Sequence, residues 1–282
     1  MWLWMSVCSA VLLGIYDVSK KQALKRNGVY WILLSATALT AVFLSPCLSA
    51  GSLADHLSLV LKAVLVSTSW VSGLFALKHL PLTTVSTIKA SRPMFVVIFS
   101  IILFGERLNL LQWLGVAIVM TALFLSTRSK RHDTDKKTTA TGMTCMIISV
   151  LSGSASALYD KHILQHLQPL FVQSWTNIYI TVLLAIVILI QYLADREHFQ
   201  PFVWDWRIPL IAVLITASDM LYFYSVKDPD ALLSVISMIR RSSVLITFLF
   251  GALLFKEGHV KDKALDMVLM MVGIALLLFG TQ

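Results

Sequence analysis

Long apolar segments separated by short polar ones run through the whole sequence. Ten of them are about 17 to 25 residues long, the length that a helix needs to cross the hydrocarbon core of a bilayer. They cover residues 2–22, 29–47, 57–77, 80–104, 109–126, 142–161, 170–192, 207–226, 231–254 and 265–281. The pattern predicts an all-α integral membrane protein with ten transmembrane helices.

Charged residues make up only 13% of the chain, and apolar residues 57%, whereas soluble domains carry roughly 25% charged residues. So few charges could not cover a surface in water, so we expect membrane lipid around the protein. The formal net charge of +8 is spread over short segments between the apolar ones. It forms no basic stripe, which argues against a nucleic-acid partner. The three cysteines, Cys8, Cys47 and Cys145, are widely spaced and predict neither a disulfide framework nor a metal site.

A polar linker at residues 127–141 divides the ten segments into five and five. We therefore expect one five-helix repeat over residues 1–126 and a second over residues 142–282. At an offset of 151 residues, segment 86–106 aligns with 237–257 and matches Ser86 with Ser237, Ile88 with Ile239, Ser91 with Ser242 and Glu106 with Glu257. Because five crossings are an odd number, the second copy enters the membrane in the opposite direction. The sequence thus predicts inverted repeats, with a site near mid-membrane where they meet.

Lysine and arginine gather in the segments that follow the odd-numbered spans. With the four intramembrane cations Lys89, Arg92, Arg240 and Arg241 left out, only four lie on the opposite side of the membrane, namely Lys62, Arg107, Lys161 and Lys227. By the positive-inside rule, the side with the surplus faces the cytoplasm and both termini lie outside.

Three basic residues lie deep in the apolar segments, at positions that the repeat relates. Lys89 is about nine residues into the fourth span, and its repeat partner Arg240 is followed directly by Arg241. A charge at that depth costs at least ~2.5–3.5 kcal/mol and normally faces a polar cavity or a partner. We interpret the three as an anion clamp. Arg92, on the same face as Lys89, is either a fourth ligand or an ion-pair partner.

A structural alternative is that these cations only hold the bundle together, paired with Asp17, Asp160 or Asp219. Asp219 itself lies two thirds along the eighth span, with Tyr222 on the same face. Its carboxylate could carry a proton or neutralise Arg240 or Arg241. The sequence does not separate these two roles.

The first and sixth spans both end in a tyrosine, an aspartate and lysine. The members are Tyr16, Asp17 and Lys20 in the first span and Tyr159, Asp160 and Lys161 in the sixth. Interfacial anchoring would account for them. Because the cluster occurs in both halves, we also include it in the candidate substrate-binding set.

One local motif resembles a known family. Pro93 lies thirteen residues before Glu106, and LLQWLG follows, with Gly115 nine residues after the glutamate. This is similar to EamA-type permeases of the drug/metabolite transporter superfamily, and the resemblance covers nearly the whole chain. The second copy departs from it, with Val244 in place of the proline and Asp266 in place of the glycine.

A shorter resemblance concerns substrate. TIKASRP (87–93), MIRRSS (238–243) and YDVSKKQALK (16–25) are similar to segments of the sugar-phosphate and nucleotide-sugar transporter branch. That similarity implies that Lys89, Arg240 and Arg241 bind phosphate.

Nucleophile elbows, phosphate-binding glycine loops and HExxH are absent from the sequence, so we expect no enzyme, cofactor or metal.

We expect a secondary transporter, a permease, exporter or exchanger, that moves a small polar, anionic metabolite by alternating access. A gradient, exchange or downhill flow would drive it. We expect a monomer or homodimer in the plasma (inner) membrane of a prokaryote. The alternatives are a sugar-phosphate or nucleotide-sugar antiporter, a non-transporting receptor or assembly protein, and a lipid-phosphate enzyme.

Overall fold

The computed structural model describes residues 1–24, 26–80, 85, 88–128, 140–194, 202–247, 250 and 260–281. Within these ranges the chain forms helices and turns, with no β-strand. In lipid, a chain can satisfy its backbone hydrogen bonds without a neighbouring strand only as a helix. The all-α prediction is confirmed for this part of the chain.

The helices follow the predicted apolar segments closely. The first half contributes α1 (Trp2–Ala23), α2 (Val29–Leu44) with the 3-10 turn η1 (Ser45–Cys47), α3 (Leu53–His79), α5 (Arg92–Phe104) and α6 (Leu110–Arg128). The second half contributes α7 (Ala140–Leu164), α8 (Pro169–Ala194), α9 (Arg207–Lys227), α10 (Leu233–Arg241) and α12 (Val260–Phe279).

Six of the described helices are long and apolar enough to cross a membrane, namely α1, α2, α3, α7, α8 and α9. The apolar parts of α6 and α12 are shorter, Leu110–Leu125 and Met267–Phe279. The chain is thus a multi-pass integral membrane protein, while the number ten stays a prediction.

Local hydrogen bonds mark where helices begin and end. Ser52 and Asp55 form a capping box at the start of α3, with the Asp55 backbone N–H donating to the Ser52 hydroxyl over 3.2 Å. Asn109 and Gln112 exchange two bonds of 2.9 Å at the start of α6. Gly105 ends α5 at φ 64°, a left-handed conformation that favours glycine. The sequence thus sets these boundaries locally.

The predicted fourth and ninth spans, 80–104 and 231–254, are interrupted where the repeat pairs Ser91 with Ser242. At Ser91 the backbone N–H donates to Ile88 O over 3.1 Å, and the hydroxyl donates to the same oxygen over 2.6 Å. Ser242 makes the same two bonds to Ile239 O, at 2.9 and 2.6 Å. Each span is therefore broken by a tight turn at its serine, after which a new helical segment begins.

Proline does not explain both interruptions. Pro93 follows the first turn, and its missing N–H suits the first turn of a helix. The second copy has Val244 at that position, and its turn at Ser242 is the same. The hydroxyl bond to the i−3 carbonyl is the feature that both turns share. Such local bonds compete with the regular helical pattern.

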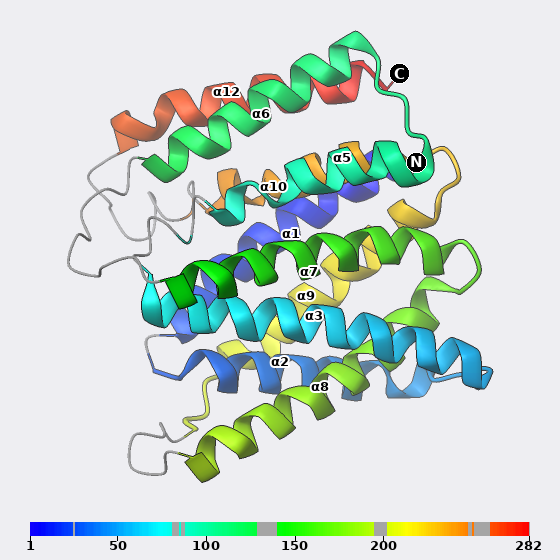
Figure 1. The fold of residues 1–282 in the computed structure, drawn as a ribbon, viewed down its shortest axis with the longest axis vertical. Helices are drawn as coiled ribbons and strands as arrows, with labels where there is room; N and C mark the ends of the chain where they lie inside the picture. Colours follow the sequence, from blue (N-terminus) through cyan, green and yellow to red (C-terminus); the bar gives the residue numbers. More distant parts are fainter. Residues whose placement is uncertain are drawn as a thin grey trace.

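Contacts between the halves come in pairs related by the repeat. Helix α3 packs on α7 as α1 packs on α9, and α3 contacts α8 as α2 contacts α9. Two pairs, α2 with α8 and α6 with α12, join equivalent helices. Figure 1 shows α1 starting at the end of the bundle where both termini lie, and α7 starting at the opposite end. A two-fold axis between inverted halves produces this pattern.

Reciprocal hydrogen bonds between serines join α3 to α7 and, in the pair that the repeat relates to it, α1 to α9. Ser69 on α3 and Ser149 on α7 each donate to the other's carbonyl, over 2.7 and 2.6 Å. Ser9 on α1 and Ser218 on α9 do the same, over 2.7 and 2.9 Å. Small hydroxylated residues let membrane helices approach closely and bond across the interface. The long contacts between the halves are therefore polar as well as close.

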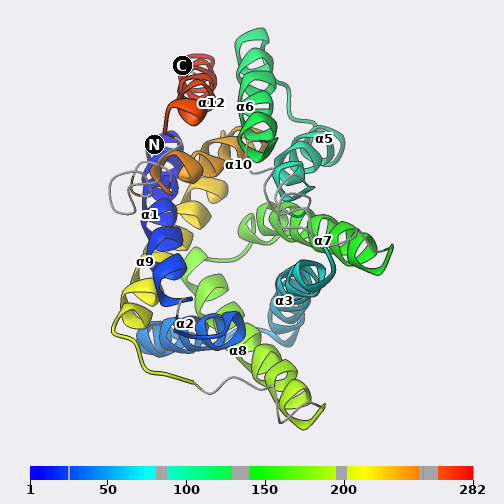
Figure 2. The ribbon, with the colours of Figure 1, turned by 90° about the vertical axis from the view of Figure 1, so that its left-hand side faces the viewer.

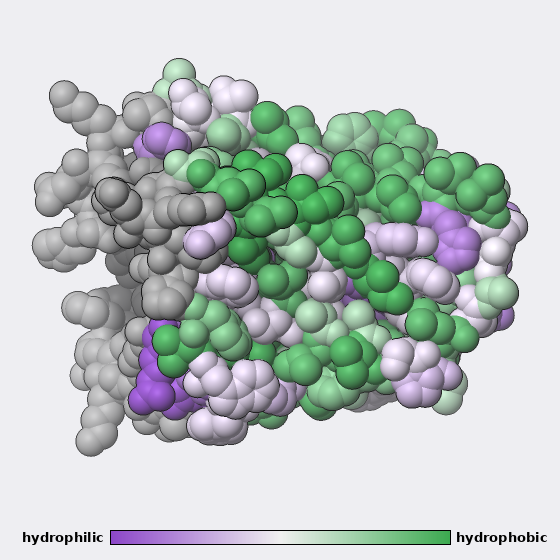
Figure 3. All heavy atoms as spheres, turned by 90° about the horizontal axis from the view of Figure 1, so that it is seen from below, coloured by the Kyte–Doolittle hydropathy of each residue, from purple (hydrophilic) through white to green (hydrophobic). Residues whose placement is uncertain are grey.

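The outer surface is predominantly apolar. Ile102 and Leu103 on α5 are 67% and 63% exposed, and Met271 on α12 is 62% exposed. Figure 3 shows hydrophobic residues over much of one face, mixed with weakly polar ones, and strongly hydrophilic residues mainly near its ends. Such a surface suits lipid as solvent.

Helices α6 and α12 lie side by side at one edge of the bundle (Figure 2), and glycines allow their close approach. A Cβ at Gly115 would lie 2.8 Å from Gly273 O and 2.8 Å from Leu277 Cγ. The second half thus supplies its own glycine, Gly273, although Asp266 stands at the position that the repeat aligns with Gly115.

We predict that Gly115→Leu lowers the free energy of unfolding in detergent by about 1–3 kcal/mol, the cost of overpacking a tight contact. Denaturation with dodecyl sulfate measures the change. Ala117→Leu, on the exposed face of the same helix, is the control and should leave stability unchanged. Equal effects of the two substitutions would contradict the close crossing.

Candidate functional site

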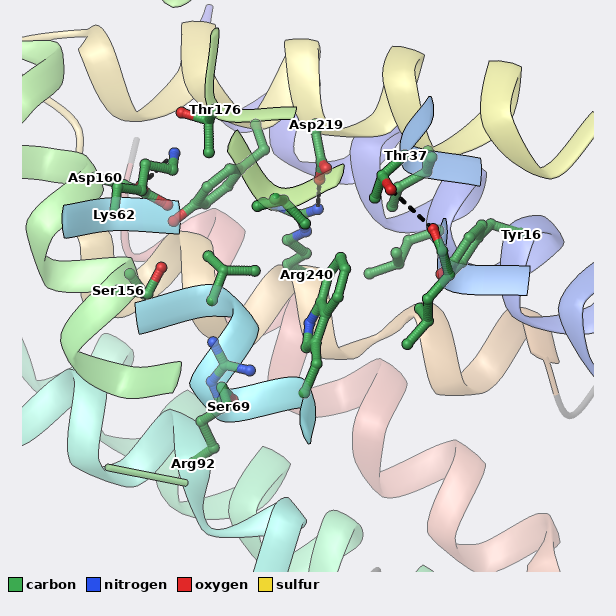
Figure 4. Close-up of a pocket in the computed structure, with 18 of the residues that line it drawn as sticks. Tyr16, Thr37, Lys62, Ser69, Arg92, Ser156, Asp160, Thr176, Asp219 and Arg240 are labelled. Carbon is green, nitrogen blue, oxygen red and sulfur yellow. Dashed lines mark hydrogen bonds and ion pairs between the residues drawn. The ribbon is translucent and has the colours of Figure 1, made fainter. Parts of the chain in front are cut away.

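A cavity of about 470 Å³ lies between the two halves. Its described lining residues come from α1, α2, α3, α5, α7, α8, α9 and α10 and from Lys89. In Figure 4, Lys62, Asp160 and Thr176 lie at one end, Tyr16 and Thr37 at the other, and Asp219 with Arg240 between them. The structure therefore has a cavity at the place where the sequence predicts that the two halves meet.

The lining carries more positive than negative charge. Among the described residues, its cations are Lys20, Lys62, Lys89, Arg92, Arg240 and Arg241, and its acids are Asp160 and Asp219. Each of the two acids already has a cation as its ion-pair partner. The cavity consequently keeps an excess of positive charge available to a ligand.

Arg240 pairs with Asp219. The guanidinium Nη2 donates to Asp219 Oδ1, and the guanidinium carbon lies 4.2 Å from the centre of the Tyr222 ring. A cation over an aromatic face gains further stabilisation where water is excluded. Of the two sequence-based roles for Asp219, this contact favours neutralisation of Arg240.

Lys62 and Asp160 form a second, more deeply buried pair. The Lys62 side chain is 3% exposed, and its Nζ lies 2.5 Å from Asp160 Oδ1. The same ammonium lies 3.9 Å from the centre of the Phe223 ring. The sequence analysis counted Lys62 among the residues flanking the membrane, and the structure corrects this: α3 begins at Leu53, so Lys62 is about two and a half turns inside the helix.

Lys89 is the least constrained of the cavity cations. It is exposed, and no hydrogen bond or ion pair joins it to another residue of the described ranges. A Cβ at Gly73 would lie 3.6 Å from its Nζ, so the glycine leaves the ammonium room beside α3. An unpaired lysine in a cavity is the side chain most open to a ligand.

The segments around the turns at Ser91 and Ser242 both contribute cations to the cavity lining. Lys89 precedes the first turn and Arg92 follows it, while Arg240 and Arg241 precede the second. The Arg92 guanidinium donates to Gly153 O, and a Cβ at Gly153 would lie 2.5 Å from its Cζ. Arg92 thus bonds to backbone rather than to an acid.

The two tyrosine–aspartate clusters do not contribute equivalent residues. From the first, Tyr16 and Lys20 line the cavity, with Lys20 Nζ 3.2 Å from the Tyr16 hydroxyl. From the second, only Asp160 does so. The structure places Asp17, Tyr159 and Lys161 outside the lining. Of these, Asp17 interacts electrostatically with Lys20 and Arg241.

Lys161 instead belongs to a polar network that joins the halves. Its Nζ donates to Glu106 Oε1 over 2.7 Å and to Ala231 O over 3.0 Å. Glu106 also accepts from the backbone N–H groups of Leu233 and Ser234, over 2.7 and 3.1 Å. The carboxylate therefore caps the N-terminus of α10, as expected of a structural glutamate. Its repeat partner Glu257 lies outside the described residues.

Sequence analysis also missed Gln173 and Thr176, which line the cavity from α8 and are 1% and 3% exposed. Their spacing of three places them on one helix face. A polar pair on one face of an otherwise apolar span was the available signal. The residues that the structure describes hold no group of three or more His, Cys, Asp or Glu placed to bind a metal ion.

Apolar helices in two related halves around a charged intramembrane cavity define a polytopic membrane protein of the solute-carrier type. The chain belongs to the EamA-like transporter family, whose family model matches residues 1–128 and 140–279. The resemblance to EamA-type permeases is thereby confirmed.

A protein of known crystal structure has a similar fold. It is 13% identical to this chain, with a TM-score of 0.73, over 98% of this chain and 94% of that one. At this identity the similarity concerns the fold alone. No curated protein matches the sequence.

We predict that Lys62→Met lowers the free energy of unfolding by about 3–5 kcal/mol, because it leaves the buried Asp160 carboxylate without its cation. The double variant Lys62→Met/Asp160→Asn should recover most of this loss. Lys227→Met, whose ammonium bonds Gln168 over 2.7 Å at an exposed site, is the control. Additive losses in the double variant would show that the two side chains do not act as a pair.

Proposed function

We propose that this protein is a secondary transporter that moves a small anionic metabolite across the membrane by alternating access. The observation that carries the proposal is the charge of the cavity. Six described cations face two acids, and both acids are already paired. In a medium of low dielectric constant, uncompensated cations attract an anion strongly.

Lys89, Arg92, Arg240 and Arg241 are the proposed anion-binding residues. They come from the repeat-related segments around Ser91 and Ser242, so an anion between them would contact both halves. Tyr16, Lys20, Tyr222 and Asp219 complete the proposed site from α1 and α9. Rocking of one half against the other would then change access to a site that both halves build.

The cation set also suits a phosphate, because guanidinium groups bind phosphate oxygens in pairs. A sugar-phosphate or nucleotide-sugar antiporter is the narrower form of the proposal. We further propose the plasma (inner) membrane of a prokaryote as its location and a monomer or homodimer as its state.

Lys89→Ala provides the cleanest test, because Lys89 has no hydrogen-bond or ion-pair partner among the described residues that its removal would leave unpaired. We predict that anion affinity falls about 10- to 100-fold, the effect of losing one hydrogen bond to a charged group. Uptake into liposomes and binding to purified protein measure the change with a panel of phosphorylated and carboxylated metabolites. Lys227→Ala, a cation outside the cavity lining, should bind and transport as the unchanged protein does.

If the single variants Lys89→Ala and Arg241→Ala both transport normally, the anion site is refuted. Binding without flux would instead indicate a receptor. Turnover of a lipid phosphate without solute movement would indicate an enzyme.

A further inference from the structure

Two buried polar side-chain atoms at one end of the cavity are left without partners, Gln173 Oε1 and Thr176 Oγ1, neither of which makes a hydrogen bond with any described residue. Lys62 Nζ and Asp160 Oδ1, also buried in the cavity lining, pair with each other at 2.5 Å and have no further hydrogen-bond partner among the described residues. All four residues line the cavity. Buried polar groups are nearly always hydrogen-bonded, so such a concentration of unpartnered ones calls for a partner that enters the cavity.

We propose that these four residues form a second subsite, which binds the neutral, hydroxyl-bearing end of the transported anion. Helix α3 supplies Lys62, α7 supplies Asp160, and α8 supplies Gln173 and Thr176. Figure 4 shows Lys62, Asp160 and Thr176 together at the end of the cavity that lies away from Tyr16. Contacts of α3 with both α7 and α8 hold the three elements side by side.

The orientation of Gln173 is fixed by its own bonds. Its amide Nε2 donates to Thr216 O over 2.9 Å, so the oxygen is the atom left for the cavity. An amide oxygen only accepts hydrogen bonds. Gln173 and Thr176 are spaced by three residues on α8, which puts the acceptor beside a hydroxyl that both donates and accepts.

The charge at this end favours a neutral group over an ion. The Lys62 ammonium and the Asp160 carboxylate lie 2.5 Å apart and offset one another. Lys62 still has protons to donate, while Asp160 Oδ1 and Gln173 Oε1 accept. A hydroxyl donates one bond and accepts others, so a pair of neighbouring hydroxyls would satisfy donors and acceptors together.

This inference rests on the proposed anion site, and it narrows the substrate class. An anion held by the cations near Arg240 would extend its other end toward Lys62, since Figure 4 places Arg240 and Asp219 between the two ends of the cavity. The substrate class is then a small anion with a hydroxylated tail. An anion with an apolar tail would leave Gln173 Oε1 and Thr176 Oγ1 buried and unsatisfied, which is costly.

Two pairs of probes test the subsite directly. Glycerol 3-phosphate and propyl phosphate share a three-carbon phosphate ester and differ by two hydroxyls, and glycerate and propionate form the matching carboxylate pair. Calorimetric titration of the full-length protein in detergent gives their affinities. We expect the hydroxylated member of at least one pair to bind about 10-fold tighter or more, the effect of one or two net hydrogen bonds.

Thr176→Val removes one hydroxyl at nearly constant volume. We expect it to weaken the hydroxylated probe about 5- to 10-fold while leaving the probe without hydroxyls unchanged, as one lost hydrogen bond predicts. Gln173→Met should act in the same direction. Thr181→Val is the matched control on α8, because its hydroxyl donates to Asn177 O over 2.7 Å and does not line the cavity.

The outcomes separate the two proposals. Equal affinity of both members in each pair, or equal weakening of both by Thr176→Val, would overturn the hydroxyl subsite and leave the anion site standing. Failure of all four probes to bind would overturn both. Preserved discrimination in Thr176→Val and Gln173→Met would likewise show that the hydroxyls are recognised elsewhere.

Discussion

The cost of placing charge inside a membrane governs the organisation of this protein. A cation deep in the hydrocarbon region persists only with a partner or a polar space. Both solutions occur here: Lys62 and Arg240 each have an aspartate, whereas Lys89 faces a cavity. The helices that carry these residues can only pack so that the charges turn inward, toward the meeting of the halves. The apolar exterior follows from the same requirement.

The two interrupted spans connect fold and site. A regular helix through Ser91 would carry Lys89 and Arg92 on one continuous face, but the serine turn separates them into different segments. Ser242 does the same in the second half, just after Arg240 and Arg241. The interruptions therefore deliver cations from two segments, one in each half, to one cavity. Reciprocal serine bonds between α3 and α7 and between α1 and α9 hold the walls of that cavity together.

Part of the site was predictable because charge in an apolar segment is visible without coordinates. Lys89, Arg92, Arg240 and Arg241 all line the cavity, as do Asp160 and Asp219. Pattern reasoning failed where the helix boundary mattered. Lys62 was counted with the residues of the loops and helix ends, yet the capping box at Ser52 starts α3 well before it. Pattern reasoning also treated the two tyrosine–aspartate clusters as equivalent, whereas different members of each cluster line the cavity.

The sequence by itself determined that the chain is helical, embedded in lipid and built from two related halves. Those properties follow from composition, segment length and a fixed repeat offset, all of which are local or additive along the chain. Only the tertiary structure decided which charges pair and which remain available. Lys161 lies next to Asp160 in sequence, yet it bonds Glu106 outside the cavity while Asp160 bonds Lys62 inside it. Neighbours on a helix point about 100° apart, so their partners depend on which helices pack against each face, and that is settled only when the halves come together.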